Sequence, residues 1–179
     1  MRAVRFHEHG GSDVLQVEDV DTPDPAADEV LVEVDGAGVN PVDTYIREGA
    51  TDPFTLPMIP GIDAGGTVAA VGESVSGFEV GDPVYGTGIG KNHYGGYAEY
   101  AAVPEDRLVG LPAGVDTATA GGAGVVSVTA WRALVDHANL QAADVCLIHG
   151  GSGGVGHAAV QIAAAAGAQV ITTAAPAYH

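Results

Sequence analysis

The residues best suited to chemistry form a glycine-rich segment that matches the pattern G-x-G-x-x-G. They are Gly151, Ser152, Gly153, Gly154, Val155 and Gly156. The apolar residues 145–148 before them are typical of a buried strand, and residues 157–166 are expected to form a helix closed by Gly167. A glycine loop between a strand and a helix predicts a dinucleotide-binding site.

The glycines of this loop have separate expected roles. Gly151 is expected to make the sharp turn, Gly153 to let the backbone approach a pyrophosphate, and Gly156 to permit close packing of helix and strand. The helix N-terminus would add free N–H groups and a partial positive charge. A purely structural turn is the alternative, but a turn alone requires fewer glycines.

The choice of dinucleotide depends on the residues that follow the second predicted strand. An NAD site commonly carries Asp or Glu about 20 residues beyond the loop, where the carboxylate binds the ribose 2′-hydroxyl. Residues 173–176 read Thr-Ala-Ala-Pro and contain no acid. Space is therefore left for a 2′-phosphate, so NADPH is the expected cofactor, with Thr173 among its binding residues. No Arg or Lys lies in this stretch to pair with the phosphate.

Two different patterns along the chain indicate two modules. Up to about Leu111, short alternating segments such as residues 29–34 and 66–71 predict strands of a compact β-barrel or sandwich. Beyond Pro112, small apolar residues at helical spacing lead into a β-α-β unit over residues 145–173. A parallel sheet needs helices on both faces, so a unit with only two strands is expected to be part of a larger domain.

The charge of the chain excludes one class of partner. It carries 23 acidic residues against 6 Lys plus Arg, a formal charge of −17. Such a surface repels phosphate backbones and anionic lipids, so nucleic acid is not an expected partner. The acidic residues also repel one another, and salt screens this repulsion. The charge therefore favours a halophilic source with a salt-rich cytoplasm. Of the 23 acids, 21 lie at or before Asp116, which marks a module boundary.

Cysteine content and hydropathy indicate the compartment. Cys146 is the only cysteine, so the chain cannot form an internal disulfide or a site with several thiolates. A reducing cytoplasm is expected. Every apolar stretch is interrupted well before it could span a membrane, and the first residues lack a secretory pattern. Neither membrane insertion nor export is expected.

Six separate segments carry a family resemblance. The clearest is residues 38–49, GVNPVDTYIREG; the others are residues 56–66, 77–85, 95–100, 129–134, and 153–156 with Gln161. In order and spacing they resemble the zeta-crystallin-type quinone oxidoreductases, a zinc-free family of medium-chain reductases. The resemblance implies a mixed fold: a GroES-like catalytic β-barrel over residues 1–120, then the first β-α-β part of an incomplete Rossmann domain over residues 121–179.

The resemblance also implies a set of site residues. Asn40 and Tyr45 would line the cleft for nicotinamide and substrate, Thr129 would touch the nicotinamide, and Asp43 would order the loop through hydrogen bonds. Tyr45 is the best candidate to bind the substrate or donate a proton. Each residue also has a structural interpretation: Asn40 in a turn, Tyr45 as a half-buried anchor, Asp43 as a helix cap and Arg47 as a solvated ion-pair partner.

Zinc-dependent relatives share the architecture but carry Cys at the position of Asn40 and a His-Glu pair at Ile62-Asp63. Zinc needs several nitrogen or sulfur ligands, so no metal is expected here. His7 and His9 form an H-x-H pair that could bind a metal, but such a pair is more often solvated.

The expected activity is hydride transfer from NADPH to a quinone without zinc. Another zinc-free reductase acting on enones or enoyl thioesters, or a non-catalytic dinucleotide-binding protein, remains an alternative. The resemblance implies a homodimer for a full-length protein, whereas residues 1–179 alone are expected to be inactive.

Overall fold

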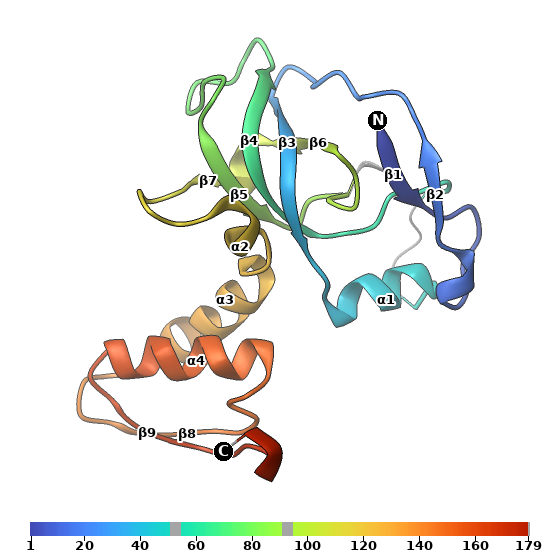
Figure 1. The fold of residues 1–179 in the computed structure, drawn as a ribbon. Coiled ribbons are helices and arrows are strands. Elements are labelled where there is room, and N and C mark those ends of the chain that lie inside the picture. Colours follow the sequence, from blue (N-terminus) through green and yellow to red (C-terminus); the bar gives the residue numbers. More distant parts are fainter. Residues whose placement is uncertain (51–54, 91–94, 179) are drawn as a thin grey trace. The chain divides into compact units, whose positions relative to one another are not determined.

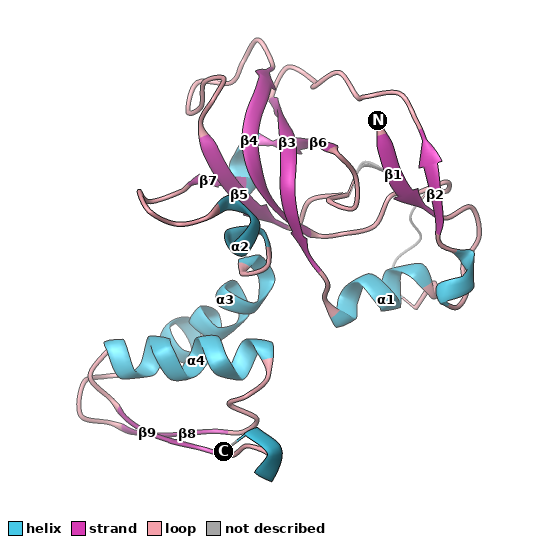
Figure 2. Cartoon of the chain, in the orientation of Figure 1, coloured by secondary structure: helices cyan, strands magenta, loops and turns pink. Residues whose placement is uncertain are grey.

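The computed structural model describes residues 1–50, 55–90 and 95–178 (Figure 1). The chain divides into two compact units, Met1–Gly124 and Val125–His179. Figure 2 shows that strands predominate in the first unit, whereas the second combines helices with one short pair of strands. The predicted domain limits of 1–120 and 121–179 stay a prediction.

A five-stranded antiparallel sheet forms the body of the first unit, in the order β6-β3-β4-β5-β7. Its strands are β3 (Glu29–Gly38), β4 (Asp63–Val71), β5 (Pro83–Thr87), β6 (Tyr100–Pro104) and β7 (Leu108–Gly110). All five contribute side chains to one apolar core, so the sheet curls around that core, as predicted for a barrel. The strand residues of the core are Val30, Val32, Ala64, Val68, Val84, Ala101, Val103 and Leu108.

A second, smaller core packs a helix against segments that flank the N-terminal strands. It contains the buried side chains of Phe6, Ile46 and Met58. The elements of this region are β1 (Arg2–Arg5), η1 (Ser12–Val14), β2 (Gln16–Asp19) and α1 (Pro41–Arg47). The alternating pattern did not predict α1, although the alternative interpretation of Asp43 as a helix cap did. Two further short 3-10 turns are η2 (Glu105–Arg107) and η4 (Pro176–Tyr178).

Helix α2 (Thr117–Gly121) lies directly on the backbone of β3 and β4. Three glycines make this approach possible. An added Cβ would lie 2.7 Å from the Ala118 Cα if placed on Gly36, 2.7 Å from the Gly121 nitrogen if placed on Gly65, and 2.6 Å from the Gly65 nitrogen if placed on Gly121. Any side chain at these glycines would therefore push α2 off the sheet.

The helical stretch predicted beyond Ala118 is divided into three parts. After α2 come α3 (Gly124–Trp131) and the π-helical turn η3 (Arg132–His137), in which the Ala138 N–H donates to the Ala133 carbonyl. Trp131, the only tryptophan of the chain, is the last residue of α3, and 53% of its surface is exposed.

The predicted β-α-β unit is confirmed in the second unit. Parallel strands β8 (Val145–Ile148) and β9 (Gln169–Thr172) are joined by α4 (Gly154–Ala165). Gly167 follows α4 with a φ of +85°, as expected for a helix terminator. The core of this unit is Ala130, Leu134, Ile148, Ala159 and Ala163.

The two faces of the β8-β9 sheet differ sharply. Ile148 lies in the core and is 8% exposed, whereas Val145, Leu147 and Ile171 are 65%, 56% and 51% exposed. Successive residues of a strand point to opposite faces, so the helices of the second unit cover one face and leave an apolar face open.

Two adjacent substitutions test this difference. Ile148→Thr is expected to lower the free energy of unfolding by about 2 kcal/mol, because it places a hydroxyl in the core. Leu147→Thr is expected to change it by less than about 0.5 kcal/mol, because the side chain is already in water. Urea unfolding followed by circular dichroism measures both; equal losses would mean that Leu147 is covered in solution.

Candidate functional site

Helix α1 begins directly after strand β3, and local sequence explains why. Asn40 at the N-cap has an extended backbone, with φ −118° and ψ 154°. Pro41 occupies the first helical position, where a missing N–H costs nothing. Asp43 accepts a 2.8 Å hydrogen bond from the Asn40 N–H, the return bond of a capping box. The same three residues therefore end the extended segment and start the helix.

Asp43 connects three segments of the first unit, although only 4% of it is exposed. Its Oδ2 accepts from the Asn40 N–H and from the Tyr97 hydroxyl at 3.1 Å, and its Oδ1 accepts from the Ile62 N–H at 3.0 Å. Burial raises the pKa of Asp43, these hydrogen bonds oppose the rise, and the nearby Asp63 adds to it. The carboxyl thus ties α1 to the segment before β4.

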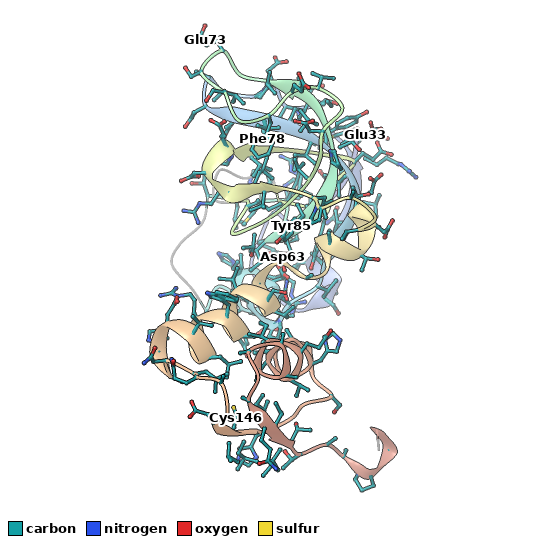
Figure 3. All side chains as sticks on the ribbon, turned by 90° about the vertical axis from the view of Figure 1, so that its left-hand side faces the viewer. Glu33, Asp63, Glu73, Phe78, Tyr85 and Cys146 are labelled. Carbon is teal, nitrogen blue, oxygen red and sulfur yellow. The ribbon has the colours of Figure 1, made fainter. Side chains whose placement is uncertain are left out.

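Asp63 is a second acidic side chain of this region, completely buried at the start of β4 (Figure 3). Its Oδ2 accepts a 2.9 Å hydrogen bond from the Asn40 Nδ2. Glycines make room for it: an added Cβ on Gly38 would lie 3.1 Å from Oδ2, and one on Gly124 would lie 2.6 Å from Oδ1. A buried carboxylate is costly unless it is hydrogen-bonded, and Asn40 supplies one such bond.

Tyr97 completes this polar group. Its hydroxyl lies 3.1 Å from Asp43 Oδ2 and 3.2 Å from the Gly38 carbonyl oxygen, so its single hydrogen is shared between two acceptors. Burial, followed by the Asp43 carboxylate, raises the pKa of Tyr97 far above its usual range. Tyr97 therefore stays protonated near neutral pH and acts as a neutral hydrogen-bond donor.

Tyr45 and Arg47, on the same helix, have opposite surroundings. Tyr45 is 52% exposed, so about half of its surface is buried, and its structural interpretation as a half-buried anchor stays open. The Arg47 side chain is only 13% exposed. Its Nε donates to the Gly10 carbonyl at 3.0 Å, and its Nη2 donates to Glu48 Oε1 at 2.6 Å. Arg47 is thus an ion-pair partner, but it is not solvated as that interpretation expected.

The structure brings Asn40 and Asp43 into one hydrogen-bonded group and places Tyr45 on the same helix. Sequence reasoning missed Asp63 and Tyr97 as members of this group. A signal for each was present, because a single acid stands in the apolar, glycine-rich residues 59–66, and Tyr97 follows two glycines. We call Asn40, Asp43, Asp63 and Tyr97 the α1 anchor.

In the second unit the glycine loop leads into α4 as predicted, but its turn lies one residue earlier. Gly150 has the left-handed backbone, with φ +69°, whereas Gly151, where the sharp turn was expected, does not. Gly151 is needed for another reason, because an added Cβ would overlap the Thr172 hydroxyl oxygen. Gly156 is buried, and a Cβ there would overlap the Gly150 carbonyl.

Hydrogen bonds within the loop leave the first turn of α4 open. The N–H groups of Gly150 and Gly151 donate to the Thr173 hydroxyl and carbonyl, at 3.1 and 2.9 Å, and the Gly153 N–H donates to the Gly150 carbonyl at 2.9 Å. The N–H groups of Gly154 and Val155, in the first helical turn, have no acceptor within their own helix. Together with the partial positive charge of the helix end, they could bind an anion.

The other predicted cofactor residues of the second unit lie in the loop, on α3 and directly after β9. Ser152 is exposed within the loop, and Thr129 is exposed on α3. Thr173 follows β9 directly, and its hydroxyl lies 3.4 Å from the His149 Nδ1. Asn40, Asp43 and Tyr45 belong to the first unit, and Thr129 and the glycine loop to the second. A common site for the two groups stays a prediction.

Within residues 1–50, 55–90 and 95–178, no three His, Cys, Asp or Glu side chains are grouped closely enough to hold a metal ion. His7 and His9 have different partners, the Glu18 carboxylate at 2.6 Å and the Arg47 carbonyl at 3.2 Å. None of the helices in the same residues has the length and apolar character needed to cross a bilayer.

Comparison with known proteins agrees with this architecture. Residues 26–113 match the alcohol dehydrogenase GroES-like domain family. The chain is 46% identical over 176 residues to a quinone oxidoreductase of Lama guanicoe, a match that covers 97% of this chain and 52% of that protein. The chain spans about half the length of the curated relatives it matches.

Solved structures agree at the level of the fold. A quinone oxidoreductase of Escherichia coli, in complex with NADPH, is 33% identical with a TM-score of 0.88, covering 99% of this chain and 54% of that one. An alcohol dehydrogenase superfamily protein of Novosphingobium aromaticivorans is 40% identical with a TM-score of 0.90, covering the same shares.

Fold and matched domain together define a GroES-like domain followed by the β-α-β start of a second domain, the arrangement of the medium-chain dehydrogenase/reductase superfamily. Within this superfamily the chain is a homologue of the zeta-crystallin-type quinone oxidoreductases.

Proposed function

We propose that a protein carrying this chain transfers a hydride from NADPH to a quinone without the help of a metal. The observation that carries the proposal is the loop of residues 150–156, which joins a parallel strand to α4 and has open N–H groups in the first helical turn. Position 173 carries Thr where an NAD site commonly carries Asp or Glu, and this favours a cofactor with a 2′-phosphate. The names of the relatives supply the substrate class, a quinone.

The proposed chemistry makes modest demands on the protein. NADPH, when bound, supplies the hydride; a quinone that accepts this hydride and one proton becomes a hydroquinone, and NADP⁺ remains. Quinones are electron-poor, so the reaction needs orientation of the two reactants more than it needs a Lewis acid.

Residues of the two units would share this work. Tyr45 has an exposed phenol that could donate a hydrogen bond, or the proton, to a quinone oxygen. Asn40 is 6% exposed, and its Nδ2 is bonded to Asp63, so it would offer a fixed amide to the nicotinamide side. Thr129, exposed on α3, is the proposed contact to the nicotinamide from the second unit.

The test is NADPH oxidation by a protein that carries the chain, with 1,2- and 1,4-naphthoquinone as acceptors. We expect turnover that is faster with NADPH than with NADH and insensitive to a strong chelator. The assay is run at low and at high KCl, because the net charge of −17 supports the proposal of a salt-rich cytoplasm.

Other outcomes have definite meanings. Loss of turnover on chelation, or turnover only with alcohols, would contradict a zinc-free quinone reductase. Turnover with conjugated enones or enoyl thioesters but not with quinones would assign the chain to another zinc-free reductase. No turnover with any acceptor, despite binding of NADPH, would identify a non-catalytic dinucleotide-binding protein.

A further inference from the structure

Helix α1 carries the best candidate for a substrate contact, yet it is too short to hold its own position. It has seven residues, and isolated helices shorter than about 12–15 residues are marginal in water. Its orientation must therefore come from contacts at its two ends. Those contacts decide where Tyr45 is presented.

The C-terminal end of α1 is held by apolar packing and by bonds to the N-terminal segment. Ile46 is 4% exposed and packs with Phe6 and Met58. The Arg47 guanidinium donates to the Gly10 carbonyl at 3.0 Å, and the Gly10 N–H donates to the Arg47 carbonyl at 3.1 Å. This end of the helix is thus fixed without any residue of the α1 anchor.

At the N-terminal end, Asp63 fixes the residue from which α1 starts. A carboxylate accepts hydrogen bonds but does not donate them, so the Asn40 amide must turn its Nδ2 towards Asp63 Oδ2. Asp63 is itself held by the sheet, where it pairs with Gly38 of β3 and Thr87 of β5. The central strand of the barrel therefore holds the side chain of Asn40 in place.

Tyr97 fixes the same end from a second direction. Its ring lies against the backbone of Gly61, where φ is +100° and an added Cβ would lie 2.5 Å from a ring carbon. Its N–H donates to the Pro60 carbonyl at 3.0 Å. The hydroxyl at the far end of the ring reaches both the end of β3, at Gly38, and α1, at Asp43.

We propose that Asp63 and Tyr97 are positioning residues that hold α1, and with it Tyr45, in one orientation. Among the described residues, the Tyr45 side chain makes no hydrogen bond of its own, so the helix alone sets the position and direction of its Cα–Cβ bond. Neither proposed positioning residue needs to touch substrate or cofactor. The effect on turnover rests on the proposed function, whereas the effect on α1 does not.

The decisive variant is Tyr97→Phe, which removes only the hydroxyl. In a protein that carries the chain, kcat with naphthoquinone is expected to fall by roughly tenfold or more, because small misplacements of a reacting group are costly. The KM for NADPH is expected to change by less than about threefold, because the glycine loop is untouched. In the 179-residue chain, the amide NMR signals of Tyr45 and its neighbours in α1 are expected to shift.

Tyr100→Phe is the matched control. Its hydroxyl also lies near a carboxylate, at 3.3 Å from Glu33 Oε1, but on the exposed side of β6. This variant should leave both kcat and the α1 signals unchanged. A conservative series at Asp63 adds a second readout: Asp63→Asn retains an acceptor oxygen for Asn40 and should keep more activity than Asp63→Ala.

The proposal and the proposed function fail in different ways. If Tyr97→Phe lowers the melting temperature but leaves kcat and the α1 signals as in the unmodified protein, Tyr97 is only structural and the proposal is overturned. If none of the acceptors supports oxidation of NADPH by the unmodified protein, the proposed function fails. The α1 signals then decide alone: a shift in Tyr97→Phe supports positioning, and unchanged signals overturn it.

Discussion

Gly65→Ala is expected to lower the free energy of unfolding of the first unit by about 3 kcal/mol or more. An added Cβ would overlap the carbonyl oxygen of Thr117 and lie 2.7 Å from the nitrogen of Gly121. Both are backbone atoms of α2, so no side chain can turn aside, and the whole helix would have to lift from β3 and β4. Urea unfolding followed by circular dichroism measures the loss.

Gly110→Ala provides the control for this substitution. Gly110 also lies in a strand of the same sheet, but among the described residues no atom lies within 4 Å of an added Cβ, and its φ is not positive. We expect a change of less than about 0.5 kcal/mol. A similarly small effect of Gly65→Ala would show that α2 does not rest on the sheet in solution.

Gly153→Ala is expected to weaken NADPH binding by roughly tenfold or more while leaving the fold intact. The nearest atom to an added Cβ is the Gly150 carbonyl oxygen at 3.3 Å, so the loop needs to give way only slightly. The methyl group would stand where the pyrophosphate is expected to approach, and loss of one hydrogen bond to a charged group costs about 1.5–3 kcal/mol. Quenching or enhancement of NADPH fluorescence in a titration measures the dissociation constant.

Gly156→Ala is the contrasting variant in the same loop. Its Cβ would overlap the Gly150 carbonyl, so we expect a loss of stability as well as of binding. Comparing Gly153→Ala with Gly156→Ala therefore separates an effect on NADPH affinity from an effect on the stability of the fold. Unchanged NADPH affinity in a stably folded Gly153→Ala variant would contradict the proposed site for the pyrophosphate.

Features of local sequence were predictable, and features of tertiary packing were not. Residues 145–148 form β8 as predicted, because an apolar run followed by glycines is a local signal. Helix α4 begins at Gly154, three residues before the predicted start, because the glycines of the loop also supply its first turn. Local patterns alone did not show that Gly150, and not Gly151, takes the left-handed backbone.

The α1 anchor shows why part of the site escaped prediction. Asn40 and Asp43 are three residues apart, a spacing that a capping box makes visible in the sequence. Asp63 lies 23 residues from Asn40, and Tyr97 lies 54 residues from Asp43, and these contacts exist only once the sheet has formed. The alternating pattern missed the helix, which only the interpretation of Asp43 as a helix cap implied, because α1 is shorter than two turns and is surrounded by strands.

Trp131 is an intrinsic fluorescence probe of the second unit. It is the only indole in the chain, it belongs to the second compact unit, and 53% of its surface faces water. Selective excitation of this indole therefore records events in the second unit, whereas circular dichroism of the strands is dominated by the first. Cooperativity between the units can thus be observed without attaching a dye or replacing a residue.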